Sequence, residues 1–224
     1  MVISLTTLID LHAQNTLEFS VGYNSGALKN LEIAPVSRYD YSGPIYKLSY
    51  ERNTKKNNFL KFQFDYLSST LASDEIPALN LDYSKTGFQI TYLKQIYNQK
   101  RFSIHLGLQS YTNSSTYTNP RESNQIFNQS IGIESRFSYQ LSEKHTLSSR
   151  LVIPVILFRN THVDNGVYSL DKYQSLQWNM YYSYAFCEHW GLKVGYDFNY
   201  DRLDIPSAFR EVQYQLNLGV NYKF

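Results

Sequence analysis

Val212-Gln213-Tyr214-Gln215-Leu216-Asn217-Leu218-Gly219-Val220-Asn221-Tyr222-Lys223-Phe224, the last thirteen residues of the chain, alternate large apolar side chains with polar or small ones. Successive side chains of a β-strand point to opposite faces, so this period of two predicts a strand with one apolar and one polar face. The apolar face carries Val212, Tyr214, Leu216, Leu218, Val220, Tyr222 and Phe224.

This stretch resembles the terminal strand of bacterial outer-membrane β-barrels, which alternates in the same way and closes on Phe. The resemblance implies that Tyr222 and Phe224 form a signal for the barrel-assembly machinery. It also implies localisation in a bacterial outer membrane, with outer-membrane lipid and lipopolysaccharide as partners. The resemblance covers the mature chain as a pattern and carries no motif of one particular family.

Nine further segments show the same alternation and are predicted to be strands, at about residues 16–24, 44–52, 58–67, 85–97, 101–111, 127–141, 146–158, 172–187 and 192–201. The connections alternate between tight turns and long loops, and the long loops are expected at 25–42, 68–84, 112–126, 159–171 and 202–211. An even number of strands with short periplasmic turns and long extracellular loops is the layout of an outer-membrane barrel. We therefore expect an all-β fold, a ten-stranded antiparallel up-and-down transmembrane barrel.

Composition agrees with one large all-β domain, since 42% of the 224 residues are hydrophobic and there are 21 Tyr and 13 Phe. A net charge of +2 gives no electrostatic basis for a nucleic-acid partner. The single cysteine, Cys187, excludes an internal disulfide framework. The chain has no apolar run of about 18 residues, the minimum for a membrane-spanning helix.

A soluble β-barrel or sandwich is the alternative fold. It would have to bury about fifty large apolar residues, more than a ten-stranded interior holds. Tyrosines also gather near the predicted strand ends, as the aromatic girdles of a membrane barrel would. These tyrosines are Tyr23, Tyr46, Tyr66, Tyr97, Tyr111, Tyr139, Tyr200 and Tyr222. The transmembrane interpretation is therefore favoured.

The N-terminus predicts a processed segment. Residues 2–11 are mostly apolar, and Leu11-His12-Ala13-Gln14 resembles the cleavage region of Bacteroidota precursors, many of which end their signal in Ala-Gln. We expect residues 1–13 to be a signal-peptide remnant and 14–224 the barrel of a small, Bacteroidota-type protein. Asp10 interrupts the apolar run and no Lys or Arg precedes it, so a frayed soluble N-terminus is the alternative.

The polar face of the predicted strands carries charges of both signs, which must pair or stay solvated in a narrow lumen. They are Glu18, Lys47, Glu51, Lys61, Asp65, Lys85, Glu134, Arg136, Arg150, Lys193, Asp197 and Asp201. Glu134, Arg136 and Arg150 are expected to form the centre of a lumen network that includes Lys193, Asp197 and Asp201. The favoured hypothesis is an ion-pair network that fills the barrel, and the alternative is a narrow path for water, ions or a small solute.

Catalytic candidates are weak. His105 lies beside Ser103 on the lumen face, which permits nucleophilic catalysis but is more typical of a satisfied lumen histidine. His162 and Asp164 in one loop and Asp74-Glu75 in another are similar to the acidic and His residues at the rim of omptin proteases. The chain departs from that family because it has no adjacent Asp-His pair and the spacing fits poorly.

Outer-membrane lipid hydrolases place Ser and His near the lipid-facing rim, and no predicted strand carries an outward His. The sequence shows no zinc spacing, phosphate loop or EF-hand, so neither a metal nor a cofactor is predicted. The favoured function is non-enzymatic: a scaffold, a surface-binding protein or a narrow porin-like pore with a charged lumen. Loops 25–42, 112–126 and 159–171 would contact a small solute or surface ligand. The alternative is a rim-active outer-membrane hydrolase.

Overall fold

The structure, a computed structural model, describes residues 14–30, 38–54, 58–74, 76, 79–118, 123–162, 164–206 and 209–224. The predicted signal remnant at 1–13 lies outside this range and stays a prediction. The described residues form eleven antiparallel strands: β1 (Gln14–Asn30), β2 (Tyr39–Asn53), β3 (Phe59–Leu71), β4 (Leu81–Gln99), β5 (Phe102–Thr118), β6 (Ser123–Gln140), β7 (His145–Asn160), β8 (Asn165–Ser169), β9 (Tyr173–Ala185), β10 (Trp190–Leu203) and β11 (Phe209–Lys223).

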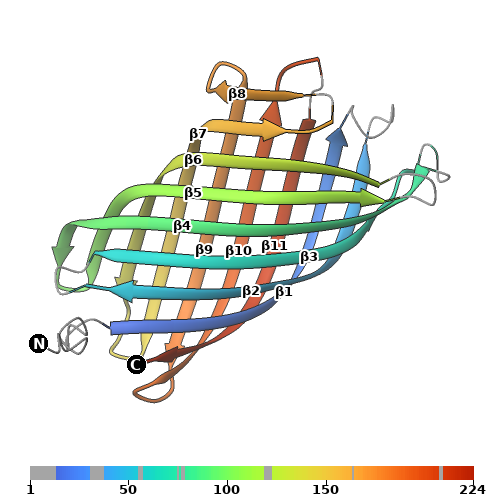
Figure 1. Cartoon of the computed structure of the whole chain (residues 1–224). Helices are drawn as coiled ribbons and strands as arrows, with labels where there is room; N and C mark the ends of the chain where they lie inside the picture. The colour runs from blue at the N-terminus through green and yellow to red at the C-terminus, as the bar shows by residue number, and fades with distance from the viewer. Residues whose placement is uncertain are drawn as a thin grey trace, which may run out of the picture.

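The strands close into a barrel because β1 pairs with β11 and β6 pairs with β7 (Figure 1). The first and last strands run together from Thr16 opposite Lys223 to Asn30 opposite Phe209. Beyond the end of this ladder, Asn15 N–H donates to the Phe224 carbonyl at 3.0 Å. We call this end of the barrel the terminal end and the opposite end the distal end. The predicted antiparallel up-and-down topology is confirmed.

The wall has ten strands although eleven are separate in sequence. β7 pairs with β9 over His145–Val152 and with β8 over Ile156–Asn160, so β8 extends the same position in the wall beyond the end of β9. The predicted ten-stranded barrel is therefore confirmed. Part of the expected loop 159–171 is a hairpin of β7 and β8, which is a correction to the predicted loop bounds.

No helix in the described part of the chain is long and apolar enough to cross a membrane.

An apolar belt surrounds the outside of the barrel. Leu216 on β11 is 64% exposed and Leu108, on the opposite side of the wall, is 60% exposed. Such large apolar side chains facing outward from every part of a closed barrel match the lipid-facing band of a transmembrane barrel. The alternation in the terminal strand therefore has the predicted sense, with its apolar face outward and its polar face in the lumen.

The strands continue past the belt at the distal end, and there the pattern inverts. On β2, Tyr46 and Leu48 face outward and are exposed, whereas Tyr39 and Tyr41 face the lumen and are buried, with Asp40 exposed between them. We call this part the distal extension, at residues 24–30, 39–45, 67–71, 81–87, 112–118, 123–130, 156–160, 165–169, 173–175, 201–203 and 209–213.

The predicted bounds of the other long loops are also wrong. Much of 25–42, 68–84, 112–126 and 202–211 is strand, because β1, β2, β4, β5 and β6 each extend well into the expected loops. Outside the lipid the outer face meets water, so it no longer needs apolar residues, and the inner face can form an ordinary buried core. An outward apolar alternation therefore marks the lipid-facing part of each strand and not its full length.

A β-bulge in β7 reverses the facing of its distal residues. The register shifts where Ile131 pairs with Ile156 and Gly132 pairs with Pro154, which leaves Val155 unpaired. A bulge fits Pro154, which has no backbone N–H to donate to the ladder. Because of the bulge Leu157, near the end of the predicted strand 146–158, faces the lumen and is 2% exposed. Tyr111 is a correction, because it lies inside the lumen and donates to Asp65 at 3.1 Å instead of joining an aromatic girdle.

A charge in the belt tests the membrane assignment. Leu216→Arg should lower the free energy of unfolding in phospholipid vesicles by about 2–4 kcal/mol, because the guanidinium would sit in hydrocarbon. The matched control is Ser25→Arg, at an exposed outward position on neighbouring β1 just past the belt, and it should cost less than about 1 kcal/mol. Reversible guanidinium unfolding measures both. Equal costs for the two variants would contradict a lipid-facing belt.

Candidate functional site: the lumen and its distal cap

Alternation along every strand sends the polar positions inward, and this places charged side chains at successive levels of the lumen. Near the terminal end, Lys193 pairs with Glu18 at 2.9 Å and Arg136 pairs with Glu51 at 3.0 Å. These are contacts across the lumen or between strands that are not neighbours in the wall. Arg136–Glu51 crosses the lumen between β6 and β2, whereas Lys193–Glu18 joins β10 and β1, the two strands on either side of β11.

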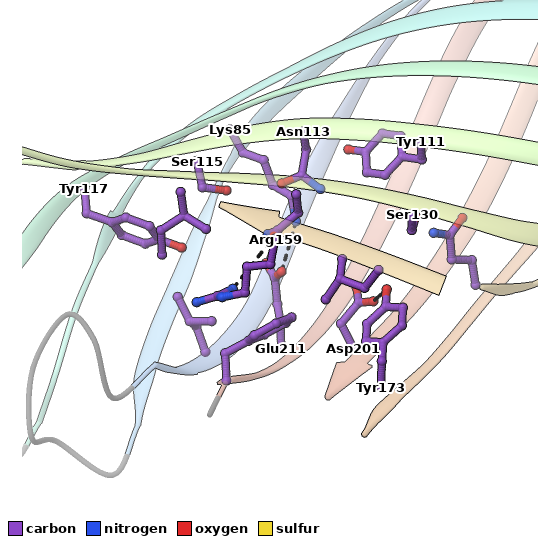
Figure 2. Close-up of a pocket in the computed structure, with 16 residues that line it drawn as sticks. Lys85, Tyr111, Asn113, Ser115, Tyr117, Ser130, Arg159, Tyr173, Asp201 and Glu211 are labelled. Carbon is purple, nitrogen blue, oxygen red and sulfur yellow. Dashed lines mark hydrogen bonds and ion pairs between the residues drawn. The ribbon is translucent and has the colours of Figure 1, made fainter. Parts of the chain in front are cut away.

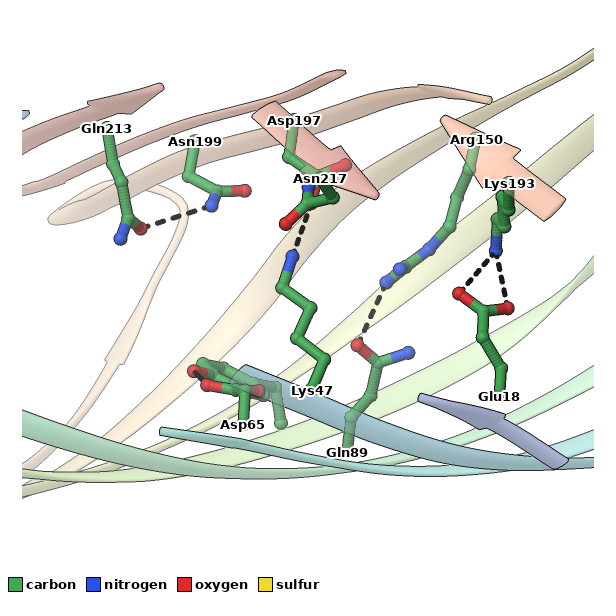
Figure 3. Close-up of polar contacts among 11 residues, drawn as sticks. Glu18, Lys47, Asp65, Gln89, Arg150, Lys193, Asp197, Asn199, Gln213 and Asn217 are labelled. Atoms are coloured by element: carbon green, nitrogen blue, oxygen red, sulfur yellow. Dashed lines mark hydrogen bonds and ion pairs between the residues drawn. The ribbon is translucent and has the colours of Figure 1, made fainter. Parts of the chain in front are cut away.

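The central level holds the most buried pair. Arg150 Nε lies 3.0 Å from Glu134 Oε1, and the two side chains are 7% and 0% exposed. The second Glu134 oxygen accepts from the Thr91 hydroxyl at 3.1 Å. Arg150 also donates to the Gln89 side-chain oxygen at 3.1 Å (Figure 3). It donates to the Gln109 side-chain oxygen at 2.5 Å as well. A buried charge needs this many partners to offset its lost hydration.

A second central pair lies beside the first. Lys47 Nζ reaches across the lumen from β2 to Asp197 Oδ2 on β10, at 2.5 Å. The same carboxylate oxygen accepts from Asn217 Nδ2 at 2.9 Å (Figure 3). We call Lys47, Asp197, Glu134 and Arg150 the central ion-pair layer. Its four charges balance, so it carries no net charge.

Toward the distal end, Lys85 pairs with Glu211 at 2.9 Å, and Tyr41 donates to the other Glu211 oxygen at 2.5 Å. Asp201 accepts from the Tyr173 hydroxyl at 2.8 Å (Figure 2). These groups lie in the distal extension. Burial, and next the Glu211 carboxylate, raises the pKa of Tyr41 well above its usual value, so the hydroxyl stays a neutral donor.

Apolar and aromatic side chains fill the rest of the distal lumen. The Tyr83 ring stacks on Tyr117 at 5.2 Å between centroids and meets Tyr41 edge-on at 5.3 Å. Arg159 lies over the Phe209 ring at 4.8 Å. The buried residues here come from every side of the wall and form what we call the distal cap: Leu28, Tyr39, Tyr41, Ile45, Leu67, Leu71, Leu81, Tyr83, Tyr117, Ile126, Leu157, Tyr173, Leu203 and Phe209.

Little space remains between these layers. The cavity at the central ion-pair layer measures about 60 Å³ and the one beside Glu211 and Asp201 about 40 Å³ (Figure 2). A buried water needs roughly 10–15 Å³ of such space, so each cavity holds a few waters and no larger solute. In the described residues the lumen is thus blocked at two levels.

The predicted network residues all face the lumen, but they do not all meet. Glu134 pairs with Arg150, whereas Arg136 pairs with Glu51. The ammonium of Lys193 pairs with Glu18, and that of Lys47 pairs with Asp197. The Asp201 carboxylate accepts a hydrogen bond from the Tyr173 hydroxyl. Sequence reasoning missed Glu211 and Arg159, because both were assigned to loops. A signal was present for Glu211, since the alternation of β11 continues one step before Val212.

The catalytic candidates are separated. His105 is buried near the terminal end, where its ring packs edge-on against Phe59 at 4.5 Å. His162 is exposed at the distal end, and Asp164 is held by Tyr168 at 2.5 Å and Arg159 at 3.4 Å. The structure therefore does not bring His105 together with either residue. Within the described ranges, no group of three or more His, Cys, Asp or Glu side chains is arranged to hold a metal.

The predicted assembly signal lies at the terminal end. Tyr222 packs against Trp190 at 4.8 Å and stacks on Phe224 at 6.0 Å between ring centroids. Phe224 is 57% exposed. An aromatic cluster at the rim fits a membrane interface. Its role in assembly stays a prediction.

No protein-family model matches the chain, and no curated protein matches it either. Several solved structures, however, superimpose on the chain. The outer membrane protease OmpT from Escherichia coli superimposes with a TM-score of 0.62 at 12% identity, over 94% of this chain and 97% of that one. An outer membrane channel from Pseudomonas putida F1 gives 0.50 at 9% identity, over 95% of each chain. Neisserial surface protein A gives 0.44 at 14% identity, over 93% of this chain and 97% of that one.

Identities this low establish the fold alone. The chain has the fold of bacterial outer-membrane β-barrels. The apolar belt around that fold places the chain in an outer membrane, with the terminal end at the periplasm and the distal extension outside the cell.

The central ion-pair layer should respond to single and double substitutions in opposite ways. Glu134→Leu alone should lower the free energy of unfolding by about 3–5 kcal/mol, because Arg150 keeps a buried charge without its partner. Glu134→Leu combined with Arg150→Met should recover most of that loss. The exposed pair Arg202–Asp204, at 3.2 Å, is the control, and Arg202→Ala should cost at most about 1 kcal/mol. Denaturant unfolding in micelles measures all three. A double variant no more stable than the single one would contradict the account.

Proposed function

We propose that this protein is a closed outer-membrane barrel that works as a non-enzymatic scaffold for binding at the cell surface. The observation that carries the proposal is the blocked lumen. The central ion-pair layer and the distal cap fill it at separate levels, and the cavities between them are of water size. A barrel filled in this way is a rigid anchor and not a route for solutes.

The distal extension offers the binding surface. Its outer face is polar over β2, β3, β4 and β5, where a shallow groove of about 560 Å³ runs across these strands. Hydroxyl side chains predominate along the groove: Ser42, Ser68, Ser69, Thr70, Ser84, Thr116 and Thr118. A surface of this composition suits a polar ligand that accepts and donates hydrogen bonds. Lipopolysaccharide beside the barrel, or a surface ligand from outside, has that chemistry.

A narrow pore is the alternative, and the charged lumen is the observation that favours it. For ions to pass, the pairs Lys47–Asp197 and Arg150–Glu134 would have to separate, and the distal cap would have to move as well. Both changes expose buried charge or apolar surface. The closed form is thus the favoured state of the barrel.

Conductance across a planar bilayer separates the two functions. The refolded mature chain should give no steady openings, because both layers block the lumen. Heat-modifiable migration on gels would show that the silent protein is folded. Steady openings whose ion selectivity changes on Arg136→Ala or Arg150→Ala would contradict the scaffold function and establish a pore through the charged lumen.

A further inference from the structure

A cavity of about 340 Å³ opens inside the terminal end of the barrel, several times the volume of the cavities above it. We call it the vestibule. It lies below the central ion-pair layer, and its rim is formed by residues beside the tight turns and the chain ends, including Gln14, Asn53 and Lys144. Small-molecule sites in proteins measure roughly 300–1,000 Å³. The vestibule is large enough for a small solute, whereas the rest of the lumen is not.

Positive charge is in excess in the vestibule. Three carboxylates line it, Glu18, Glu51 and Glu143. Six cations line it: Lys61, Arg136, Lys144, Arg150, Lys193 and Lys223. Three of the cations are paired with carboxylates, since Lys193 binds Glu18, Arg136 binds Glu51 and Arg150 binds Glu134. A concave site with an excess of one sign of charge attracts ions of the opposite sign.

Lys61 is the group that the surrounding protein does not satisfy. It is 7% exposed and lines the vestibule from β3. No hydrogen bond or ion pair joins its ammonium to any residue in the described part of the chain. Its partner in the strand register is Glu51, but that carboxylate is bound to Arg136. The side chain is largely buried, and an ammonium with no partner from the chain has to be satisfied by water or by an anion in the vestibule.

The electrostatic surroundings of Lys61 increase the need for an anion. Lys193, Arg150 and Arg136 all lie near enough to repel its ammonium, and the two carboxylates that attract it are Glu18 and Glu51. Arg136 already binds Glu51. Glu18 is already bound to Lys193. An anion placed beside Lys61 would therefore be attracted by several fixed cations at once. Its oxygens would also have neutral neighbours, since Ser49 and Asn221 line the same cavity.

We propose that the vestibule binds a small phosphate-bearing solute that enters from the periplasm, with Lys61 as its main charge partner. Phosphate matches the site because lysine binds it as a point charge and because a dianion neutralises more of the cationic excess than a monoanion does. The cavity volume leaves room for a small organic group beside the phosphate. Inorganic phosphate and a phosphate monoester share this chemistry.

Isothermal titration calorimetry on the refolded barrel in detergent micelles tests the proposal. The probes are inorganic phosphate and sn-glycerol 3-phosphate, with glycerol as the uncharged control. Both phosphates should bind and glycerol should not. Tighter binding of the monoester would identify an organic phosphate as the ligand, and equal binding would identify inorganic phosphate.

Lys61→Met removes the charge and keeps the length of the side chain, and it should weaken binding at least about tenfold. Lys29→Met is the matched control, because Lys29 is exposed at the far end of β1, and its binding should equal that of the wild type. Binding by Lys61→Met as tight as wild type would overturn the proposal, as would the absence of binding by the wild type at millimolar phosphate.

Thermal unfolding of the unmodified protein gives a readout that needs no variant. A ligand that binds only the folded state raises the melting temperature. Phosphate should therefore raise it above the value in sodium chloride of equal ionic strength. The Lys61→Met variant should melt at the same temperature in both salts. Equal melting temperatures of the wild type in the two salts would overturn the proposal even if Lys61→Met failed to fold.

Discussion

Hydrogen bonding between β1 and β11 is the interaction on which the rest of the structure depends. Lipid offers no partner for a backbone N–H or C=O group, so a sheet survives there only when it has no edge. The ladder from Thr16–Lys223 to Asn30–Phe209 removes the edge. Once the sheet is closed, alternation assigns each residue to lipid or to lumen. The apolar belt and the charged lumen are two results of this one constraint.

This constraint applies only within the membrane, and beyond the membrane surface the apolar residues face the other side of the wall. Below that level the apolar residues face outward and the lumen is held by ion pairs such as Arg150–Glu134. Above it, tyrosines such as Tyr41 and Tyr83 turn inward and build a core like that of a soluble barrel. The distal cap therefore closes the lumen with the hydrophobic effect, and the central layer closes it with charge. The vestibule below both layers is left open to solvent and positively charged.

Much of this architecture could be predicted from the sequence, because an outward apolar alternation is visible in every lipid-facing segment. The full strand lengths could not be predicted, since past the belt the alternation changes phase, as it does between Ile45 and Tyr46. The sequence placed all the network residues in the lumen, but it did not predict which of them pair with one another. Arg136 and Glu134 share a strand, and only the closed barrel brings Glu51 to Arg136. The side that Leu157 faces could not be predicted from alternation either, because the bulge adds one residue and reverses the facing of the residues beyond it.

Spin labels along β2 would test the inversion most directly. With Cys187→Ser as background, nitroxides at Asp40, Ser42, Tyr46 and Leu48 probe four outward positions of one strand. Accessibility to oxygen, which concentrates in lipid, should be high at Tyr46 and Leu48. Accessibility to a water-soluble nickel complex should be high at Asp40 and Ser42. Oxygen accessibility that stayed high at all four positions would place the distal extension in the membrane and contradict the account.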